Sequence, residues 1–391
     1  MLNTWTVGLP PGCNFALRWV ACVGVLGCAA QVAAPAAQTA SQRALQVTTP
    51  VTVVTPGSAT NVRDLYLEAQ RVQAAGEHSK AAALYDALVR YDPRGEFATQ
   101  ALFQGALAHE EAGDHAAAAH RFEQLARGFP EAVESTDALV RAIRLSVYQE
   151  QWERAGEQAE LLLKRENVLA PRHKVVAFSG RALGLLAKSD VESAERFVSE
   201  GRRVVDEFQL DTAGAVPRDL AQLYYALAET RRIRAERIEF TSADHFTRDF
   251  EIRAQLLLDA QGAYSDCMRA HDAHWTAMAG FRVGELYQKL HQAVMQVPRP
   301  SGADTPRRRQ LLEGAMRLRY SVLLDKGIRM LEQTLAMAER TGEQSTWVAR
   351  SRAVLEELAV ASEDEKKAVD ALPFSRADLQ AVLHELNNRR H

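Results

Sequence analysis

Cys267, His271 and His274 are of residue types that bind soft transition metals, and they lie close together in the chain. Spacings of four and three residues would place the three side chains on one face of a helix. Three ligands on one helix rarely converge on an ion unless another segment supplies a further ligand. We therefore predict no metal and no cofactor, and interpret Cys267 as a half-buried thiol flanked by histidines at a helix end.

Clusters of charged residues are the other candidates for chemistry. They are the acidic Glu110-Glu111, Glu356-Glu357 and Glu363-Asp364-Glu365, and the basic Arg231-Arg232-Ile233-Arg234 and Arg307-Arg308-Arg309. Catalysis by paired acids needs a cleft and two different environments, so we expect the acidic clusters on solvated helix faces. Glu229, Glu236 and Glu239 interleave the first basic cluster, which predicts a salt-bridged helix face. The second follows a loop, and contact with anionic lipid or peptidoglycan stays open as an alternative.

Motifs typical of common enzymes do not occur in the sequence. It has no Gly-rich phosphate loop, no Gly-x-Ser-x-Gly, no His-Glu-x-x-His and no Cys-x-x-Cys. We predict a non-enzymatic protein without a small-molecule substrate. Two alternatives remain. One is a cell-wall hydrolase or transferase with its site in the 217–391 half, which a deep pocket holding a buried Glu or His would favour. The other is a structural subunit that binds peptidoglycan passively.

Length and composition bound the class of protein. The chain has 391 residues, of which 47% are hydrophobic, with 47 Lys and Arg against 50 Asp and Glu. This is enough apolar chain for a large core and excludes a disordered protein. The formal net charge of −3 excludes a nucleic-acid binder that relies on phosphate contacts, because such a protein needs a basic surplus.

The N-terminal segment has the pattern of an export signal. Arg18 is the one charged residue among the first forty, and an apolar run over residues 19–26 follows it. The run is far shorter than the roughly 18–20 residues that span a bilayer, so we predict a cleaved signal rather than a membrane helix.

The sequence Val25-Leu26-Gly27-Cys28 at the end of that run resembles the lipobox of bacterial lipoproteins. The resemblance implies a signal peptide over 1–27, cleavage before Cys28 and acylation of Cys28, which would attach the protein to a membrane. Ala29 stands where an Asp would favour inner-membrane retention, so the resemblance implies the periplasmic side of the outer membrane. An ordinary cleaved signal is the alternative. Residues 28–60, rich in Ala, Thr, Pro and Val, predict a flexible tether.

Residues 61–210 repeat with a period near 37. Small residues mark the register, at Ala81, Ala118, Ala155 and Ala194, the first three 37 residues apart. Each unit holds two amphipathic segments, in the second unit residues 97–112 and 115–128. Such a small residue lets two helices approach closely, and Pro93 and Pro130 predict the ends of the second helices.

This pattern of a small residue, an aromatic residue four positions later and a Pro resembles the tetratricopeptide repeat (TPR), with a longer unit than the usual 34 residues. The resemblance implies an all-α solenoid of helical hairpins whose first helices line a groove that binds other proteins. The register places eight residues there: Tyr66, Gln70, Gln73, Phe103, Leu107, Glu110, Arg144 and Val147. The alternative is that some of these side chains only pack against the next hairpin.

Residues 217–391 predict a C-terminal region of longer helices, at roughly 217–240, 246–270, 273–296, 307–340, 346–361 and 375–389. These helices predict either a bundle or larger, irregular hairpins. The blocks 281–287 (FRVGELY) and 319–326 (RYSVLLDK) resemble, more loosely, TPR lipoproteins of deltaproteobacterial envelopes, including those of the myxobacterial gliding machinery. Together the sequence predicts a lipid-anchored adaptor that holds other envelope proteins.

Overall fold

The computed structural model describes residues 62–211, 218–243, 245–298 and 305–388. Every regular element in these ranges is helical, and residues Asn61–Leu386 form one compact unit. The predicted signal peptide over 1–27, the predicted tether over 28–60 and Cys28 lie outside the described residues. No described helix combines the length and the apolar character needed to cross a bilayer.

The repeat region forms four consecutive helical hairpins, as predicted. Their helices are α1 (Val62–Ala74), α2 (His78–Tyr91), α3 (Ala98–Glu111), α4 (His115–Gly128), α5 (Ser135–Tyr148), α6 (Trp152–Leu163), α7 (Pro171–Ala187) and α8 (Val191–Phe208), with a short 3-10 turn at Glu166–Val168. The register alanines Ala81, Ala118, Ala155 and Ala194 are all 0% exposed. Tyr85 and Phe122, four residues after the first two, are also 0% exposed, so the predicted pairing of a small and a large residue is confirmed.

The turn inside each hairpin keeps one backbone conformation even where its sequence changes. Gly76 and Gly113 adopt positive φ, at 79° and 81°, and so do Glu150 and Ser189, at 60° and 62°. These are equivalent positions of the four units, so the third and fourth hairpins retain the turn without glycine. The residue after the turn caps the next helix in two of the hairpins. The Asp114 carboxylate accepts the Ala117 N–H at the start of α4, and the Asp190 carboxylate accepts the Ser193 N–H at the start of α8.

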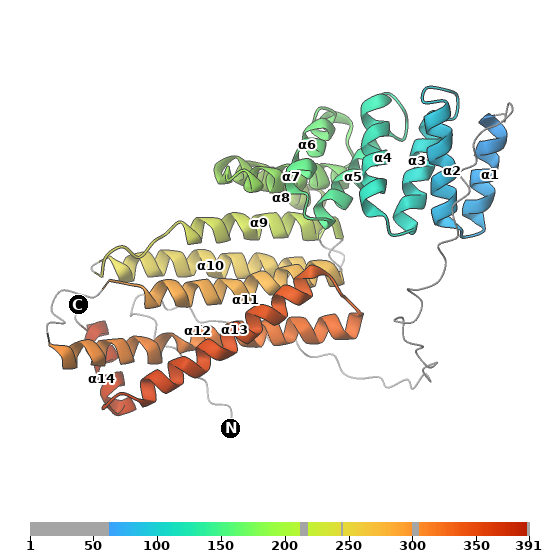
Figure 1. Cartoon of the computed structure of the whole chain (residues 1–391). Helices are drawn as coiled ribbons and strands as arrows, with labels where there is room; N and C mark the ends of the chain where they lie inside the picture. Colours follow the sequence, from blue (N-terminus) through green and yellow to red (C-terminus); the bar gives the residue numbers. More distant parts are fainter. Residues whose placement is uncertain (1–61, 212–217, 244, 299–304, 389–391) are drawn as a thin grey trace, which may run out of the picture. The chain divides into compact units, whose positions relative to one another are not determined.

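The C-terminal region continues the hairpin arrangement with longer helices. These are α9 (Arg218–Glu236), α10 (Phe246–Met268), α11 (Ala273–Met295), α12 (Pro306–Thr341), α13 (Thr346–Asp370) and α14 (Arg376–Asn388). Figure 1 shows α9, α10, α11 and α12 as long helices, and each contacts the next. In addition α5 contacts α7, α7 contacts α9, α9 contacts α11 and α11 contacts α13.

This pattern, in which the first helices of neighbouring hairpins also touch one another, is that of a solenoid. It favours the larger hairpins over the bundle. The predicted C-terminal helices start within a residue or two of the observed ones, but α13 continues to Asp370 rather than ending at residue 361. The fold is all-α and TPR-like, with longer helices after the repeats.

Two glycines allow the closest approach between helices in the repeat region. Gly156 of α6 and Gly184 of α7 face each other, and a Cβ added to Gly184 would lie 2.5 Å from the Gly156 Cα. A Cβ added to Gly156 would lie 2.8 Å from the Gly184 Cα. Because the obstructing atoms are backbone rather than a mobile side chain, neither position accepts a larger residue without moving a helix.

We expect Gly184→Ala to lower the free energy of unfolding by about 1–3 kcal/mol or more, because α6 and α7 must separate. Gly262→Ala is the matched control. Gly262 lies in the middle of α10 with nothing within 4 Å of an added Cβ, so alanine should raise the free energy of unfolding there by about 0.5–1 kcal/mol. Denaturant unfolding of both variants measures the difference, and equal effects would contradict the close packing of α6 on α7.

Candidate partner-binding face

The first part of the candidate face is built on α1. Tyr66 is half-buried and stacks on Phe97, with ring centroids 4.9 Å apart and planes inclined by 27°. Gln70, one turn later, is exposed, and its Nε2 donates to the Tyr66 hydroxyl at 3.2 Å. Gln73 is more constrained, because its Oε1 accepts the hydroxyl of buried Tyr85 at 2.9 Å. Burial raises the pKa of Tyr85 to about 12, so this hydroxyl stays a donor at neutral pH.

The next part is supplied by α3. Phe103 is half-buried and meets the edge of Phe122 at a centroid distance of 5.6 Å. Leu107, one turn later, is also half-buried and, like Phe103, packs against the hydrophobic cluster that contains Phe122. Each of these side chains therefore anchors the hairpin through part of its surface and leaves the rest accessible.

At α5 the predicted residues are engaged within the chain. Glu110 of α3 accepts Nη1 of Arg141 at 3.0 Å. Arg144 donates to both carboxylate oxygens of Asp219 at the start of α9, each at 2.8 Å. Val147 is 0% exposed and belongs to the main hydrophobic core, so it offers no surface to a partner.

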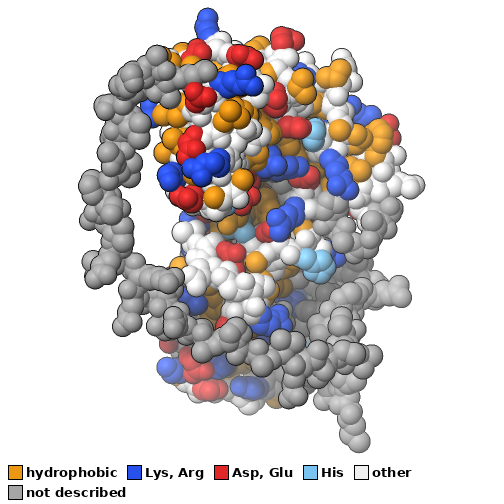
Figure 2. All heavy atoms as spheres, turned by 90° about the vertical axis from the view of Figure 1, so that its right-hand side faces the viewer, with side chains coloured by type: hydrophobic (Ala, Val, Ile, Leu, Met, Phe, Trp, Pro, Cys, Tyr) orange, Lys and Arg blue, Asp and Glu red, His pale blue; other side chains and the backbone are white. Residues whose placement is uncertain are grey.

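Figure 2 shows the side of the molecule that carries α1. Hydrophobic side chains lie there among interspersed acidic and basic ones, without a single dominant charge. A surface of this composition suits recognition of a protein segment with both apolar and polar groups.

A buried cluster of charges joins α9, α10 and α11. Glu229 is 7% exposed and accepts two bonds from Arg232, at 3.1 and 2.7 Å. It also accepts the hydroxyl of Tyr264, and Arg282 Nε lies 3.4 Å from its Oε1. Arg282 in turn donates Nη1 to Glu285 at 2.6 Å. The sequence indicated a salt-bridged face here, but not the burial of Glu229, because its partners come from distant helices.

The environment of Glu229 fixes its charge. Burial alone would raise its pKa, but Arg282, Arg232 and the Tyr264 hydroxyl outweigh burial and lower the pKa to about 2. Burial and the neighbouring Glu229 charge raise the pKa of Tyr264. Glu229 therefore stays ionised at neutral pH and cannot serve as a proton donor in catalysis, since an acid catalyst needs a raised pKa.

The remaining charged clusters are placed as follows. Arg231 and Arg234 both reach Glu195 of α8, at 2.8 and 3.0 Å, which confirms a salt-bridged face for that cluster. Glu365 departs from the prediction of a solvated face, because its carboxylate is 11% exposed and pairs with Arg317 at 2.8 Å. Arg307 and its two neighbours are exposed at the start of α12.

The three metal-type residues do not share a helix. Cys267 is fully buried near the end of α10, His271 is exposed in the following loop with φ of 54°, and His274 is buried in the first turn of α11. The left-handed residue His271 breaks the helix and separates the side chains, so the expectation of one shared helical face was wrong. Within the described residues, no three His, Cys, Asp or Glu side chains gather in a metal-binding arrangement.

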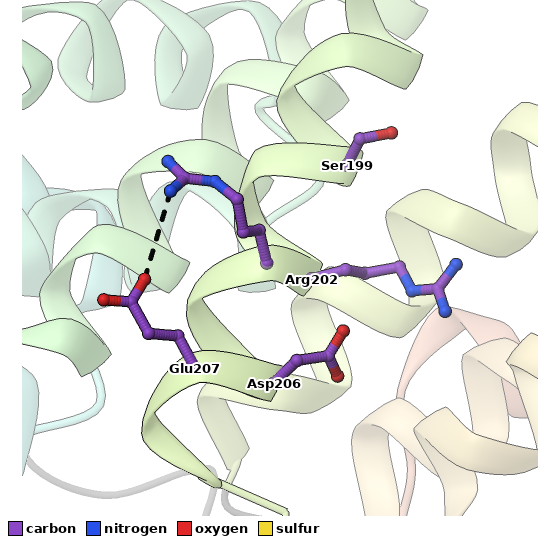
Figure 3. A pocket seen from close by; sticks show the side chains of 5 residues that line it. Ser199, Arg202, Asp206 and Glu207 are labelled. Atoms are coloured by element: carbon purple, nitrogen blue, oxygen red, sulfur yellow. Dashed lines mark ion pairs between the residues drawn. The ribbon is translucent and has the colours of Figure 1, made fainter.

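Two surface hollows lie outside the candidate face. Figure 3 shows the first, a charged patch on α8 where Arg203 lies 3.9 Å from Glu207. Ser199, Arg202 and Asp206 complete it, and all five residues lie on the exposed face of this one helix. The second lies between the end of α12 and the start of α13, with Glu332, Glu339 and Leu355 among its lining residues.

Comparisons with known proteins find low similarity throughout. No family model matches the chain, and no curated protein matches it. A tetratricopeptide repeat protein from Parabacteroides merdae has a TM-score of 0.38 at 13% identity, over 76% of this chain and 98% of that one. TPR-like repeats from Podosopora anserina have a TM-score of 0.35 at 14% identity, over 53% of this chain and 96% of that one. The assembly chaperone of RpL4 (Acl4) has a TM-score of 0.39 at 11% identity, over 80% of this chain and 100% of that one.

We expect Glu229→Gln to lower the free energy of unfolding by about 3–5 kcal/mol, because Arg232 and Arg282 lose their shared buried countercharge. Glu356→Gln, on the exposed face of α13, should change it by no more than about 0.5 kcal/mol.

The lowered pKa of Glu229 predicts that the stability of the fold depends on pH. A lowered carboxylate pKa contributes stability that is complete above the ordinary value of 4.5 and is lost as pH falls toward about 2. The melting temperature of the wild type should therefore fall more steeply over this range than that of Glu229→Gln. Parallel curves in differential scanning calorimetry would show that Glu229 is not held by this network.

Proposed function

We propose that this protein is a non-enzymatic adaptor that holds segments of other proteins on the face formed by α1 and α3. The observation that carries the proposal is the set of half-buried aromatic and aliphatic side chains Tyr66, Phe103 and Leu107 at the predicted groove positions, with Gln70 exposed beside Tyr66. These side chains are already ordered by contacts within the hairpins. A partner that covers them would bury apolar surface at a small cost in side-chain entropy.

We further propose that the adaptor is a lipoprotein of the bacterial outer membrane, attached on the periplasmic side through Cys28. Support comes from the sequence, where the apolar run and Val25-Leu26-Gly27-Cys28 follow a single positive charge. Attachment would confine the protein to the membrane surface and raise its effective concentration near other envelope proteins. The resemblance at residues 281–287 and 319–326 supports membership of a trans-envelope assembly, with gliding machinery as an example.

The rival hydrolase proposal needs an acid whose proton can be exchanged in the C-terminal half. Glu229 is the buried acid of α9, and its low pKa and enclosing arginines favour a structural role for it. This observation argues against Glu229 as the catalytic acid of a hydrolase.

A photo-crosslinking amino acid at Gln70 should capture a discrete envelope protein in intact cells, because Gln70 is exposed beside Tyr66. The same amino acid at His120, exposed on α4, is the control and should capture much less of that protein. Phe103→Ala, introduced into the Gln70 crosslinker, should reduce the yield about tenfold or more if Phe103 is a central contact. Equal capture from both positions would contradict recognition by the α1 and α3 face.

Cys28→Ala should move the protein from the membrane fraction to the soluble fraction while its thermal unfolding stays unchanged. Each acyl CH₂ that enters a membrane contributes about 0.8 kcal/mol, so loss of the acyl chains removes the anchor. Cys267→Ala is the control, because Cys267 is buried in the fold and should not affect fractionation. Membrane retention of Cys28→Ala at the wild-type level would contradict lipid attachment.

A further inference from the structure

Polar and ring contacts link the end of α5 to the longer helices, beside the hydrophobic core that the third hairpin shares with them, and we call these contacts the α5 junction. It comprises the bidentate pair of Arg144 with Asp219, the ring contact of Tyr148 with His274 at a centroid distance of 4.0 Å, and the pair of Glu150 with Arg350 at 3.1 Å. The junction engages Arg144 and Tyr148 of α5, although these side chains stay 43% and 42% exposed.

His274 lies at the centre of the α5 junction in an unusual environment. Its side chain is 94% buried, and neither ring nitrogen has a hydrogen-bond partner. The nearest carboxylate oxygen is Oε1 of Glu343, at 3.8 Å from Nδ1, which is too far for a hydrogen bond. A neutral imidazole tolerates this position, whereas a charged one would lack direct hydrogen-bond acceptors.

The charged groups around His274 already have other partners. Asp272 caps α11 through the Trp275 N–H and pairs with Arg218 at 3.1 Å. The Glu343 carboxylate accepts the Ser345 N–H at 3.1 Å. Glu150 is bound to Arg350, and Tyr148 and the buried Cys267 are neutral groups whose pKa values are raised. Arg218 and Arg350 therefore offset the charges of Asp272 and Glu150, two of the three carboxylates near His274.

The position of His274 on its helix adds to the cost of a positive charge. It lies in the first turn of α11, where the helix dipole is positive and disfavours a cation. Burial is the largest influence on its pKa and lowers it, although Glu343, Asp272 and Glu150 act in the opposite direction.

We propose that the α5 junction is a proton-sensitive latch, which opens when His274 becomes protonated in mildly acidic solution. In the closed state His274 is neutral and packed on Tyr148. In the open state it is hydrated and can take up a proton at its ordinary pKa near 6.5. A histidine whose pKa is lowered in the closed state stabilises that state above this value, and the stabilisation declines as pH falls.

Opening would release Arg144 and Tyr148, which are already 43% and 42% exposed, from their contacts on α9 and α11 and free both side chains to contact a partner of the candidate face. This consequence rests on the proposed adaptor function, whereas the opening itself does not.

Hydrogen exchange of the full-length chain tests the latch. We compare the wild type with His274→Phe, which keeps the ring contact and removes the titration. Peptides covering the end of α5, the start of α11 and the loop between α12 and α13 should exchange up to about tenfold faster in the wild type than in the variant at about pH 5.5, and equally at about pH 7.5.

His291→Phe is the matched control. His291 is also buried, at 5% exposed, with Nε2 unpartnered and 3.8 Å from Glu365, but it lies away from α5. It should leave the pH response of the α5 junction unchanged. If His274→Phe does not fold, the wild type alone decides the outcome, through the ratio of exchange at the α5 junction to that in α3 and α4 at each pH. A ratio that stays constant, or that falls in acid, would overturn the proposal.

Discussion

Close approach of helix backbones is the constraint on which the structure depends. A hairpin can stack on the next only where one helix offers no bulky side chain, and the alanines at 81, 118, 155 and 194 meet this need in every unit. At α6 and α7 even a methyl group is too large, and two glycines face each other. The same requirement returns in the longer helices, where a Cβ on Gly284 would collide with Leu331. The packing of the hairpins therefore depends on small residues where helices meet as much as on apolar side chains.

Features with a local cause could be predicted from the sequence. The alanine register, the helix ends near Pro93 and Pro130 and the starts of the long helices follow from periodicity and from residues that terminate helices. The left-handed turns at Glu150 and Ser189 could not be predicted from residue type, because neither residue prefers that conformation. The same backbone hydrogen bond closes all four turns, as in Gln151 N to Ser146 O and Asp190 N to Leu185 O, so the period of the repeat could have located them.

The candidate face shows the same division. Tyr66, Gln70 and Phe103 lie where the repeat register placed them, on first helices and partly exposed. Val147 and Arg144 could not be assigned from the register, because Val147 is enclosed in the main hydrophobic core and Arg144 pairs with Asp219 from a distant stretch of the chain. Glu229 was missed for a similar reason: its interleaved arginines suggested a surface face, and only the packing of α10 and α11 encloses it.

The hairpin contacts have a mechanical consequence. From α1 to α4 each helix packs mainly on its chain neighbours, so a pull applied there stretches successive interfaces one after another, as in a spring. The ion cluster around Glu229 instead ties three helices at one point, and bending that segment would break several charged contacts together.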